Sequence, residues 1–149
     1  MQQSGNSRAW PPPWQEFKDR TLSRQDFRTC TLNGLPVVTT PAELDMDTNK
    51  QLSDAILAAS ADAAVVVVDM TATTFLDCSG LGTLMRAHRR LEDNGIELRV
   101  ASSHERVRWL MAYFGDDHRI RVFDTLPEAV TTRPMTARPR NRSPYREAA

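Results

Sequence analysis

The sequence lacks the features of a membrane protein, a disulfide-stabilised secreted protein or a zinc protein. No stretch approaches the roughly eighteen apolar residues that span a bilayer, and the first residues lack the apolar run of a signal peptide. The two cysteines, Cys30 and Cys78, show no Cys-x-x-Cys or Cys/His spacing. We therefore expect a cytoplasmic protein with reduced thiols, without a metal site and without a cofactor.

The motifs of common catalytic sites are also missing. Cys78 is followed six positions later by Leu84 instead of Arg, which excludes a cysteine phosphatase loop. Ser79 does not lie in a Gly-x-Ser-x-Gly sequence, and Gly80-Leu81-Gly82 lacks the Lys-Ser/Thr of a P-loop. The three histidines are too dispersed to predict a metal site or a catalytic base: His88, His104 and His118. We therefore expect no enzymatic activity.

The net charge of the chain is zero, but the charges are unevenly distributed. A chain of 149 residues with 40% hydrophobic content suits one domain with tails. Residues 1–26 carry a net +1 and residues 133–149 carry +4, which leaves −5 for residues 27–132. An acidic globular body does not resemble a nucleic-acid binder.

The two tails lack the pattern of a folded segment, because the first has no sustained period and the second has almost nothing to bury. Residues 1–26 contain Pro11-Pro12-Pro13 between Trp10 and Trp14, which is typical of a disordered, mobile leader, or alternatively of a docking peptide in polyproline II form. Residues 133–149 are rich in Arg and Pro and are expected to be a disordered tail, whose charge could contact nucleic acid or membrane. The predicted domain is residues 27–132.

The predicted domain opens with a hairpin. Residues 27–32 and 35–39 flank Asn33-Gly34, the strongest short hairpin signal, and Pro36 places the second strand near an edge or at a strand start. A helix is expected next, with Asp45 or Asp47 as its cap and one face made of Leu52, Ala55, Ile56 and Ala59.

Strands and helices then alternate. Residues 63–68 form an apolar run without alternation, which is typical of a strand covered on both faces in a parallel sheet. An amphipathic helix ending at Asn94-Gly95 follows, and its buried face is expected to contain Leu81, Leu84, Met85, His88 and Leu91. Strand 96–100, a helix over 107–114 ended by Gly115, strand 120–123 and a helix from Leu126 complete the pattern. The fold class is α/β, with one mixed sheet (an antiparallel N-terminal hairpin, then parallel β-α units) packed with about four helices.

The informative segment links the buried strand to the next helix. It runs from Asp69 to Gly82, and Asp77 to Gly80 fall where the chain turns into the helix and free amide groups are exposed. A hydroxyl there, on Ser79, suits both a helix cap and an accessible phosphoacceptor. Gly80 and Gly82 add no side chains, so we expect that the backbone of a partner protein can approach closely.

This segment resembles the STAS domains of anti-sigma factor antagonists. The shared features are a Val-rich strand ending in Asp, a hydrophobic-Asp step and x-Ser-Gly-Leu-Gly, together with Ala42-Glu43-Leu44-Asp45 before the first helix. The C-terminal pattern is similar too, at Val107-Arg108-Trp109-Leu110 and from Val122 to Ala129. The resemblance covers about residues 27–132. It departs at Cys78, where the family usually has Ser or Thr, and at Ala42, where it usually has Gly.

The resemblance implies a bacterial signalling protein that regulates transcription by partner switching. In this family the serine before Gly-Leu-Gly is phosphorylated by an anti-sigma factor that is a serine kinase, and by position that serine is Ser79. It also implies a partner-binding set, which comprises Asp45, Asp77, Cys78, Ser79, Gly80, Leu81 and Gly82. The unphosphorylated protein is expected to bind the anti-sigma factor and release the sigma factor, as a monomer or weak dimer.

Several alternatives stay open on the residues alone. Ser79 is either a phosphoacceptor or a helix cap and nothing more, and Asp69 and Asp77 either belong to the site or simply cap or solvate the loop. Cys78 is either a small buried or semi-buried filler or a redox-sensitive thiol near a helix N-terminus. As a further alternative, the domain is a STAS scaffold subunit of a larger signalling or lipid-transport assembly without phosphoregulation. A modifiable Ser79 separates the antagonist from the scaffold.

Overall fold

The computed structural model describes residues 27–114 and 120–134. The expected leader at 1–26, most of the expected tail, Gly115 and His118 lie outside these residues. The domain boundaries drawn from the sequence therefore stay a prediction.

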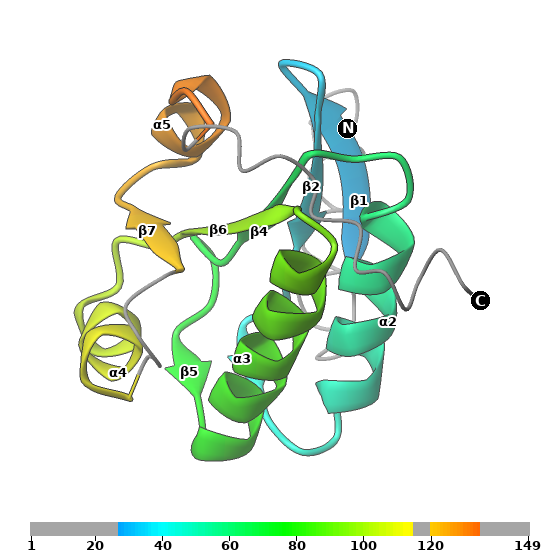
Figure 1. Cartoon of the computed structure of the whole chain (residues 1–149). Helices are drawn as coiled ribbons and strands as arrows, with labels where there is room; N and C mark the ends of the chain where they lie inside the picture. Colours follow the sequence, from blue (N-terminus) through cyan, green and yellow to red (C-terminus); the bar gives the residue numbers. More distant parts are fainter. Residues whose placement is uncertain (1–26, 115–119, 135–149) are drawn as a thin grey trace, which may run out of the picture.

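The described chain forms one mixed five-stranded sheet in the order β1-β2-β4-β6-β7 and a separate two-stranded sheet, β3-β5 (Figure 1). Strands β1 and β2 are antiparallel, and the other neighbours in both sheets are parallel. The strands are β1 (Arg28–Leu32), β2 (Leu35–Thr39), β3 (Glu43–Leu44), β4 (Val65–Asp69), β5 (Phe75–Leu76), β6 (Glu97–Ala101) and β7 (Arg121–Phe123). The helices are α2 (Asn49–Ala59), α3 (Cys78–Asp93), α4 (Glu105–Phe114) and α5 (Leu126–Thr131). The predicted fold class is confirmed.

The hairpin β1–β2 turns at Asn33 and Gly34, as predicted. Both have positive φ, 51° and 77°, which is the requirement of a type I′ turn. The Asn33 side chain also donates from Nδ2 to the Val130 carbonyl oxygen at 2.7 Å, and so ties the turn to α5.

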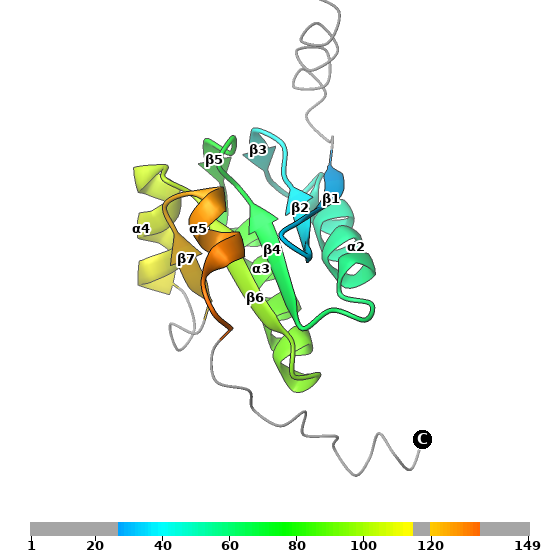
Figure 2. The ribbon, with the colours of Figure 1, turned by 90° about the horizontal axis from the view of Figure 1, so that it is seen from above.

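Strand β4 is the centre of the sheet, and the two faces of the sheet are covered differently (Figure 2). Val66 and Val68 face the larger core cluster, which includes side chains of α2, α3 and α4. Val65 and Val67 face a smaller cluster that α5 closes with Ala129 and Val130. This two-sided burial explains the unbroken valine run.

Helix α3 buries the face that the sequence predicted. Leu81, Leu84, Met85, His88 and Leu91 are all buried. The helix ends at Asp93 with Asn94 as its C-cap, and Gly95 follows with φ 72°, as expected of a left-handed stop.

The predicted cap of α2 is wrong. Thr48 occupies the cap position and makes no side-chain capping bond. Asp45 instead accepts from the Asp47 amide on Oδ1 at 2.9 Å, and the Asp45 amide donates to the Thr48 hydroxyl at 3.0 Å. Both aspartates lie in a turn that precedes the helix, because the chain first makes strand β3.

A buried arginine joins β6 to α5 on the smaller-cluster side of the sheet. The Arg99 side chain is fully buried, and its Nε and Nη2 donate to the two carboxylate oxygens of Glu97 at 3.0 and 3.3 Å. Its Nη1 donates to the Ala129 carbonyl oxygen at 2.6 Å. Arg121 contacts the same Glu97 carboxylate at 3.2 Å, and both arginines lie over the Phe123 ring. No sequence pattern predicted this cluster.

Candidate functional site

The segment between β4 and α3 is held by hydrogen bonds to the chain after β2. The Thr73 hydroxyl donates to the Pro41 carbonyl oxygen at 2.6 Å and lies 2.7 Å from the Thr40 hydroxyl. The Thr40 amide donates to the Asp69 carbonyl oxygen at 3.0 Å, where β4 ends. Thr40 and Thr73 are buried, so these bonds form in a nearly dry setting and fix the path of the loop.

Strands β3 and β5 then pair over only two residues each. Glu43 lies opposite Phe75, and Leu44 lies opposite Leu76. The Thr74 and Phe75 amides both donate to the Ala42 carbonyl oxygen, and the Asp77 amide donates to the Leu44 carbonyl oxygen. This pairing brings the segment around Asp45 beside the segment around Ser79.

Gly80 is the point at which α3 rests on this small sheet. A Cβ at Gly80 would lie 2.8 Å from the Leu76 Cδ1 atom and 3.1 Å from the Leu44 carbonyl oxygen. A side chain therefore does not fit without displacement of the β3–β5 pair. The structure corrects the expectation for this glycine, because the backbone that approaches closely belongs to the chain itself.

Asp77 is the cap of α3, so the interpretation of Ser79 as the cap is wrong. The Asp77 carboxylate accepts from the Gly80 amide at 2.8 Å and from the Ser79 hydroxyl at 2.7 Å, both on Oδ1. Ser79 is the second residue of the helix and is partly exposed. Its hydroxyl proton is bound to Asp77, which leaves the oxygen lone pairs free to face solvent.

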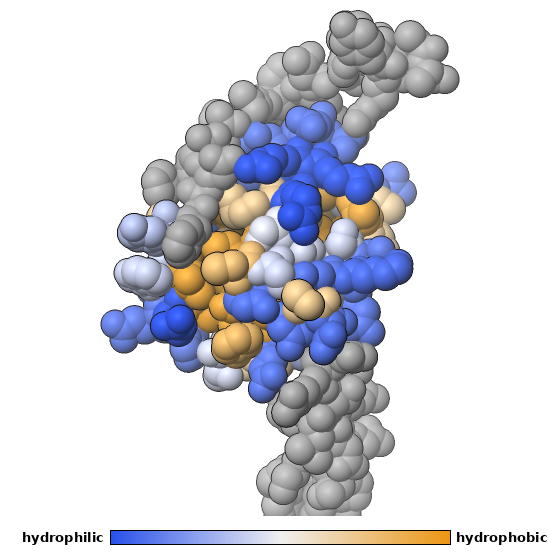
Figure 3. Space-filling model, turned by 90° about the horizontal axis from the view of Figure 1, so that it is seen from below, coloured by the Kyte–Doolittle hydropathy of each residue, from blue (hydrophilic) through white to orange (hydrophobic). Residues whose placement is uncertain are grey.

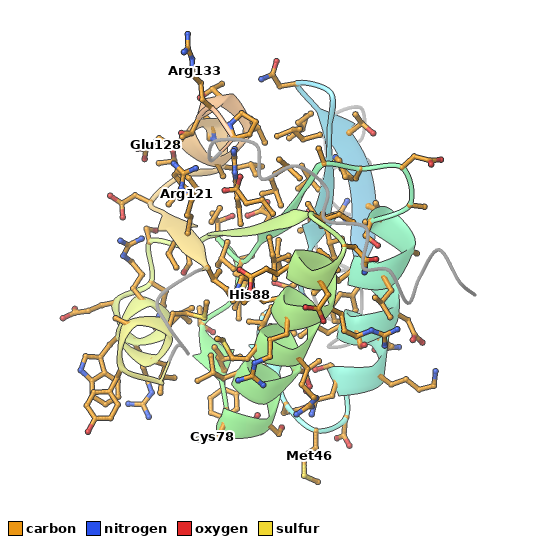
Figure 4. All side chains as sticks on the ribbon, in the orientation of Figure 1. Met46, Cys78, His88, Arg121, Glu128 and Arg133 are labelled. Atoms are coloured by element: carbon orange, nitrogen blue, oxygen red, sulfur yellow. The ribbon has the colours of Figure 1, made fainter. Side chains whose placement is uncertain are left out.

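The surface around Ser79 carries exposed apolar side chains. Met46 is 75% exposed and Phe75 is 46% exposed, and the Cys78 thiol is exposed as well. Met46 and Cys78 lie at the same end of the molecule (Figure 4). Seen from that end, apolar surface gathers among charged side chains (Figure 3). We call Met46, Phe75, Asp77, Cys78 and Ser79 the Ser79 face.

The exposure of Cys78 contradicts its interpretation as a small buried or semi-buried filler. Cys78 is the first residue of α3, where its side chain projects away from the core. Whether the thiol responds to oxidation stays a hypothesis.

The structure separates the expected partner-binding residues into two groups. Asp45, Asp77, Ser79 and Gly82 are partly exposed, and Cys78 is exposed. Gly80 is buried and Leu81 is only 5% exposed, so these two shape the site from beneath.

Sequence reasoning missed Met46 and Phe75 as members of the surface. Phe75 belongs to β5 and Met46 follows two residues after β3, and this strand pair is too short to give a strand pattern. The available signal was an apolar residue within two positions of each polar landmark, Asp45 and Asp77.

A cluster of metal-binding side chains and a membrane-spanning helix are both absent from the described residues. Residues 27–114 and 120–134 contain no group of three or more His, Cys, Asp or Glu side chains that could hold a metal ion. None of the helices in these residues is long and apolar enough to cross a bilayer.

The arrangement of strands, together with the aspartate-capped helix that bears Ser79, can be compared with known proteins. The model of the STAS domain family matches residues 27–129. The chain belongs to the STAS domain family. A comparison with curated protein sequences found no match.

Several solved STAS structures resemble this chain. An anti-sigma factor antagonist from Mycobacterium paratuberculosis is 28% identical with a TM-score of 0.64, over 71% of this chain and 91% of that one. An anti-sigma factor antagonist domain protein from Planctomyces limnophilus is 22% identical with a TM-score of 0.61, over 70% and 94%. The Bacillus cell fate determinant SpoIIAA, solved in its phosphorylated form, is 19% identical with a TM-score of 0.56, over 70% and 96%.

The two glycines of the STAS helix α3 are expected to respond to alanine in opposite directions. Gly80→Ala should lower the free energy of unfolding by about 1–3 kcal/mol through overpacking against Leu44 and Leu76. At Gly82 an added Cβ meets only the Arg86 Nη1 atom at 3.4 Å, the end of a flexible side chain. Gly82→Ala should therefore raise the free energy of unfolding by about 0.5–1 kcal/mol through helix propensity.

Urea unfolding followed by circular dichroism measures both variants on the same helix. A stabilised Gly80→Ala variant would contradict the close packing beneath the helix.

Proposed function

We propose that this STAS domain is an anti-sigma factor antagonist that binds an anti-sigma factor through the Ser79 face and is switched off by phosphorylation of Ser79. The anti-sigma factor is then also the serine kinase. The observation that carries the proposal is a partly exposed serine hydroxyl, oriented by a carboxylate and flanked by exposed apolar side chains.

The similarity to solved antagonists supports the proposal. The protein from Mycobacterium paratuberculosis is described as an anti-sigma factor antagonist. SpoIIAA is described in a phosphorylated form, so a protein of this fold can carry a phosphate. By its position before Gly80-Leu81-Gly82, Ser79 is the residue that we propose as the phosphoacceptor.

The local geometry suits phosphoryl transfer from a bound kinase. The Ser79 hydroxyl donates to Asp77 Oδ1 at 2.7 Å, so its lone pairs are directed away from Asp77. In the transfer the Ser79 oxygen forms a bond to the γ-phosphorus of ATP, the bond to the β-phosphate oxygen breaks, and the hydroxyl proton leaves. Asp77 orients the attacking oxygen and is a ready acceptor for that proton.

The apolar members of the Ser79 face supply the docking energy. Burial of apolar surface is worth about 25 cal/mol per Å², and exposed Met and Phe side chains are typical anchors of an interface. Phosphorylation would add about −1.5 to −2 charges to Ser79, on the same face as Met46 and Phe75. Docking of the partner and phosphorylation of Ser79 therefore oppose each other on this face.

A phosphorylation reaction tests the proposal. The protein is incubated with candidate anti-sigma kinases and ATP, and the phosphosite is mapped by mass spectrometry. We expect phosphate on Ser79 and none on Ser79→Ala. Ser103, an exposed serine after β6, is the internal control, and modification there with Ser79 untouched would contradict the proposal.

A scaffold subunit is the second candidate. An exposed apolar surface can also dock a partner permanently, without a phosphoacceptor. A scaffold would bind its partner with equal affinity whether residue 79 is Ser, Ala or Asp.

A further inference from the structure

Four residues of α3 lie along one stripe of the helix, in which Thr83 is buried and the other three are partly or fully exposed. Ser79, Gly82, Thr83 and Arg86 have the spacing i, i+3, i+4 and i+7, which places them on the same side. The Thr83 hydroxyl donates to the Ser79 carbonyl oxygen at 3.0 Å, and Arg86 Nη2 donates to that hydroxyl at 3.1 Å. Arg86 is thus connected to the backbone of Ser79 through a single side chain.

Gly82 allows the arginine to lie flat along this stripe. A Cβ at Gly82 would be 3.4 Å from Arg86 Nη1, so the guanidinium lies over the backbone at Gly82. Helical side chains lean toward the N-terminus, and here the lean carries the Arg86 charge from its own turn toward the turn of Ser79.

The Arg86 guanidinium has N–H donors that are not used within the described residues. Within residues 27–114 and 120–134 the guanidinium donates a hydrogen bond to Thr83, and no carboxylate there forms an ion pair with it. A guanidinium has five N–H donors in a planar fork that suits phosphate oxygens.

The charges on either side of Ser79 are opposite. Toward the N-terminus lies the Asp77 carboxylate, 2.7 Å from the Ser79 oxygen. Toward the C-terminus lies Arg86. A phosphoserine has no hydroxyl proton to donate to Asp77 and carries about −1.5 to −2 charges, so Asp77 repels the group that it formerly held.

We infer that Arg86 is the intramolecular receptor for the phosphate on Ser79. The inference rests on the proposed modification of Ser79 and specifies what that modification does. The phosphate turns from Asp77 toward the stripe, where the guanidinium binds it through charge-assisted hydrogen bonds. The phosphate is then held on the helix surface, and Arg86 is withdrawn from any contact with a partner.

The experiment places phosphoserine at position 79 during translation, so that no kinase is needed. The phosphorus NMR signal of the full chain is titrated with pH in the parent protein, in Arg86→Gln and in Arg90→Gln. Arg90 is an exposed arginine one turn further along α3, so its variant loses the same charge at a greater distance. A nearby cation favours the dianion, and Arg86→Gln should raise the titration midpoint by at least about half a pH unit. Arg90→Gln should raise the midpoint by no more than about a third as much. The midpoint of Arg86→Lys should fall between those of the parent and Arg86→Gln.

An unchanged midpoint in Arg86→Gln, or an equal rise in Arg90→Gln, overturns the inference. Because Arg86 is exposed, its variants are expected to fold, and circular dichroism verifies this. Failure of every kinase to modify Ser79 would instead refute the proposed function and leave the titration result intact.

Discussion

Ser79→Asp is expected to bind the anti-sigma partner at least tenfold more weakly than the parent protein, a loss of about 1.4 kcal/mol. Ser79→Ala is expected to bind as the unmodified protein does, without being switched off by the kinase and ATP. Calorimetric titration of the partner with the three proteins measures the difference.

The loss arises at the interface and not from unfolding. A negative charge in the first turn of a helix is favourable by about 0.3–1 kcal/mol, although Asp77 beside it reduces that gain. A docked partner would have to desolvate the new charge next to Met46 and Phe75, on a body that already carries −5 over residues 27–132. The circular dichroism spectra of all three proteins should therefore coincide.

Ala61→Asp is the matched control, since it adds the same charge in an exposed turn beyond the far end of α2. It should bind as the parent does. Equal affinities for Ser79→Ala and Ser79→Asp would replace the switch by the scaffold interpretation.

Arg99→Ala is expected to lower the free energy of unfolding by about 3–5 kcal/mol, the range for breaking a buried ion pair. The variant removes the donors to both Glu97 oxygens and leaves the Ala129 carbonyl oxygen without its bond from Nη1. It also leaves a cavity beneath α5. Urea unfolding followed by circular dichroism gives the free energies.

Arg121→Ala provides the comparison, because Arg121 contacts the same carboxylate from a half-exposed position. Its loss should cost no more than about 1 kcal/mol. Arg121 lies far from Cys78 and Met46 (Figure 4), and the buried cluster that it shares adjoins α5. Folded Arg99→Ala should thus still bind the partner, and a specific loss of binding would show that the cluster influences the Ser79 face.

The main elements of the fold could be predicted because each had a strong local signal. The valine run at 65–68 required burial on both faces, and Asn33-Gly34 required a tight hairpin turn. The buried face of α3 followed from residues spaced by three and four positions. In each case the spacing of residues along the chain determines which of them share a face of a helix or a strand, so the pattern can be read without knowledge of distant contacts.

The parts that could not be predicted depend on contacts between distant segments. Strands β3 and β5 are each two residues long, and they pair where the loops after β2 and β4 are also joined through Thr40 and Thr73. The sequence offered both Asp77 and Ser79 as caps, and the choice between them depends on the exact residue at which α3 begins. The exposure of Cys78 depends on that residue too. Gly80 was expected to face a partner, and its fit against Leu44 and Leu76 could be seen only in three dimensions.

The small β3–β5 sheet has a consequence for local opening. The amide protons of Thr74, Phe75 and Asp77 are bonded to carbonyl oxygens of only two residues, Ala42 and Leu44. Those of Val66 to Val68 lie at the centre of the large sheet between two neighbours. In native-state hydrogen exchange the first group should exchange through sub-global openings, and the second only through unfolding of the whole domain. The segment that presents Ser79, the proposed phosphoacceptor, is thus expected to adapt its shape to a partner while the valine strand beneath it stays closed.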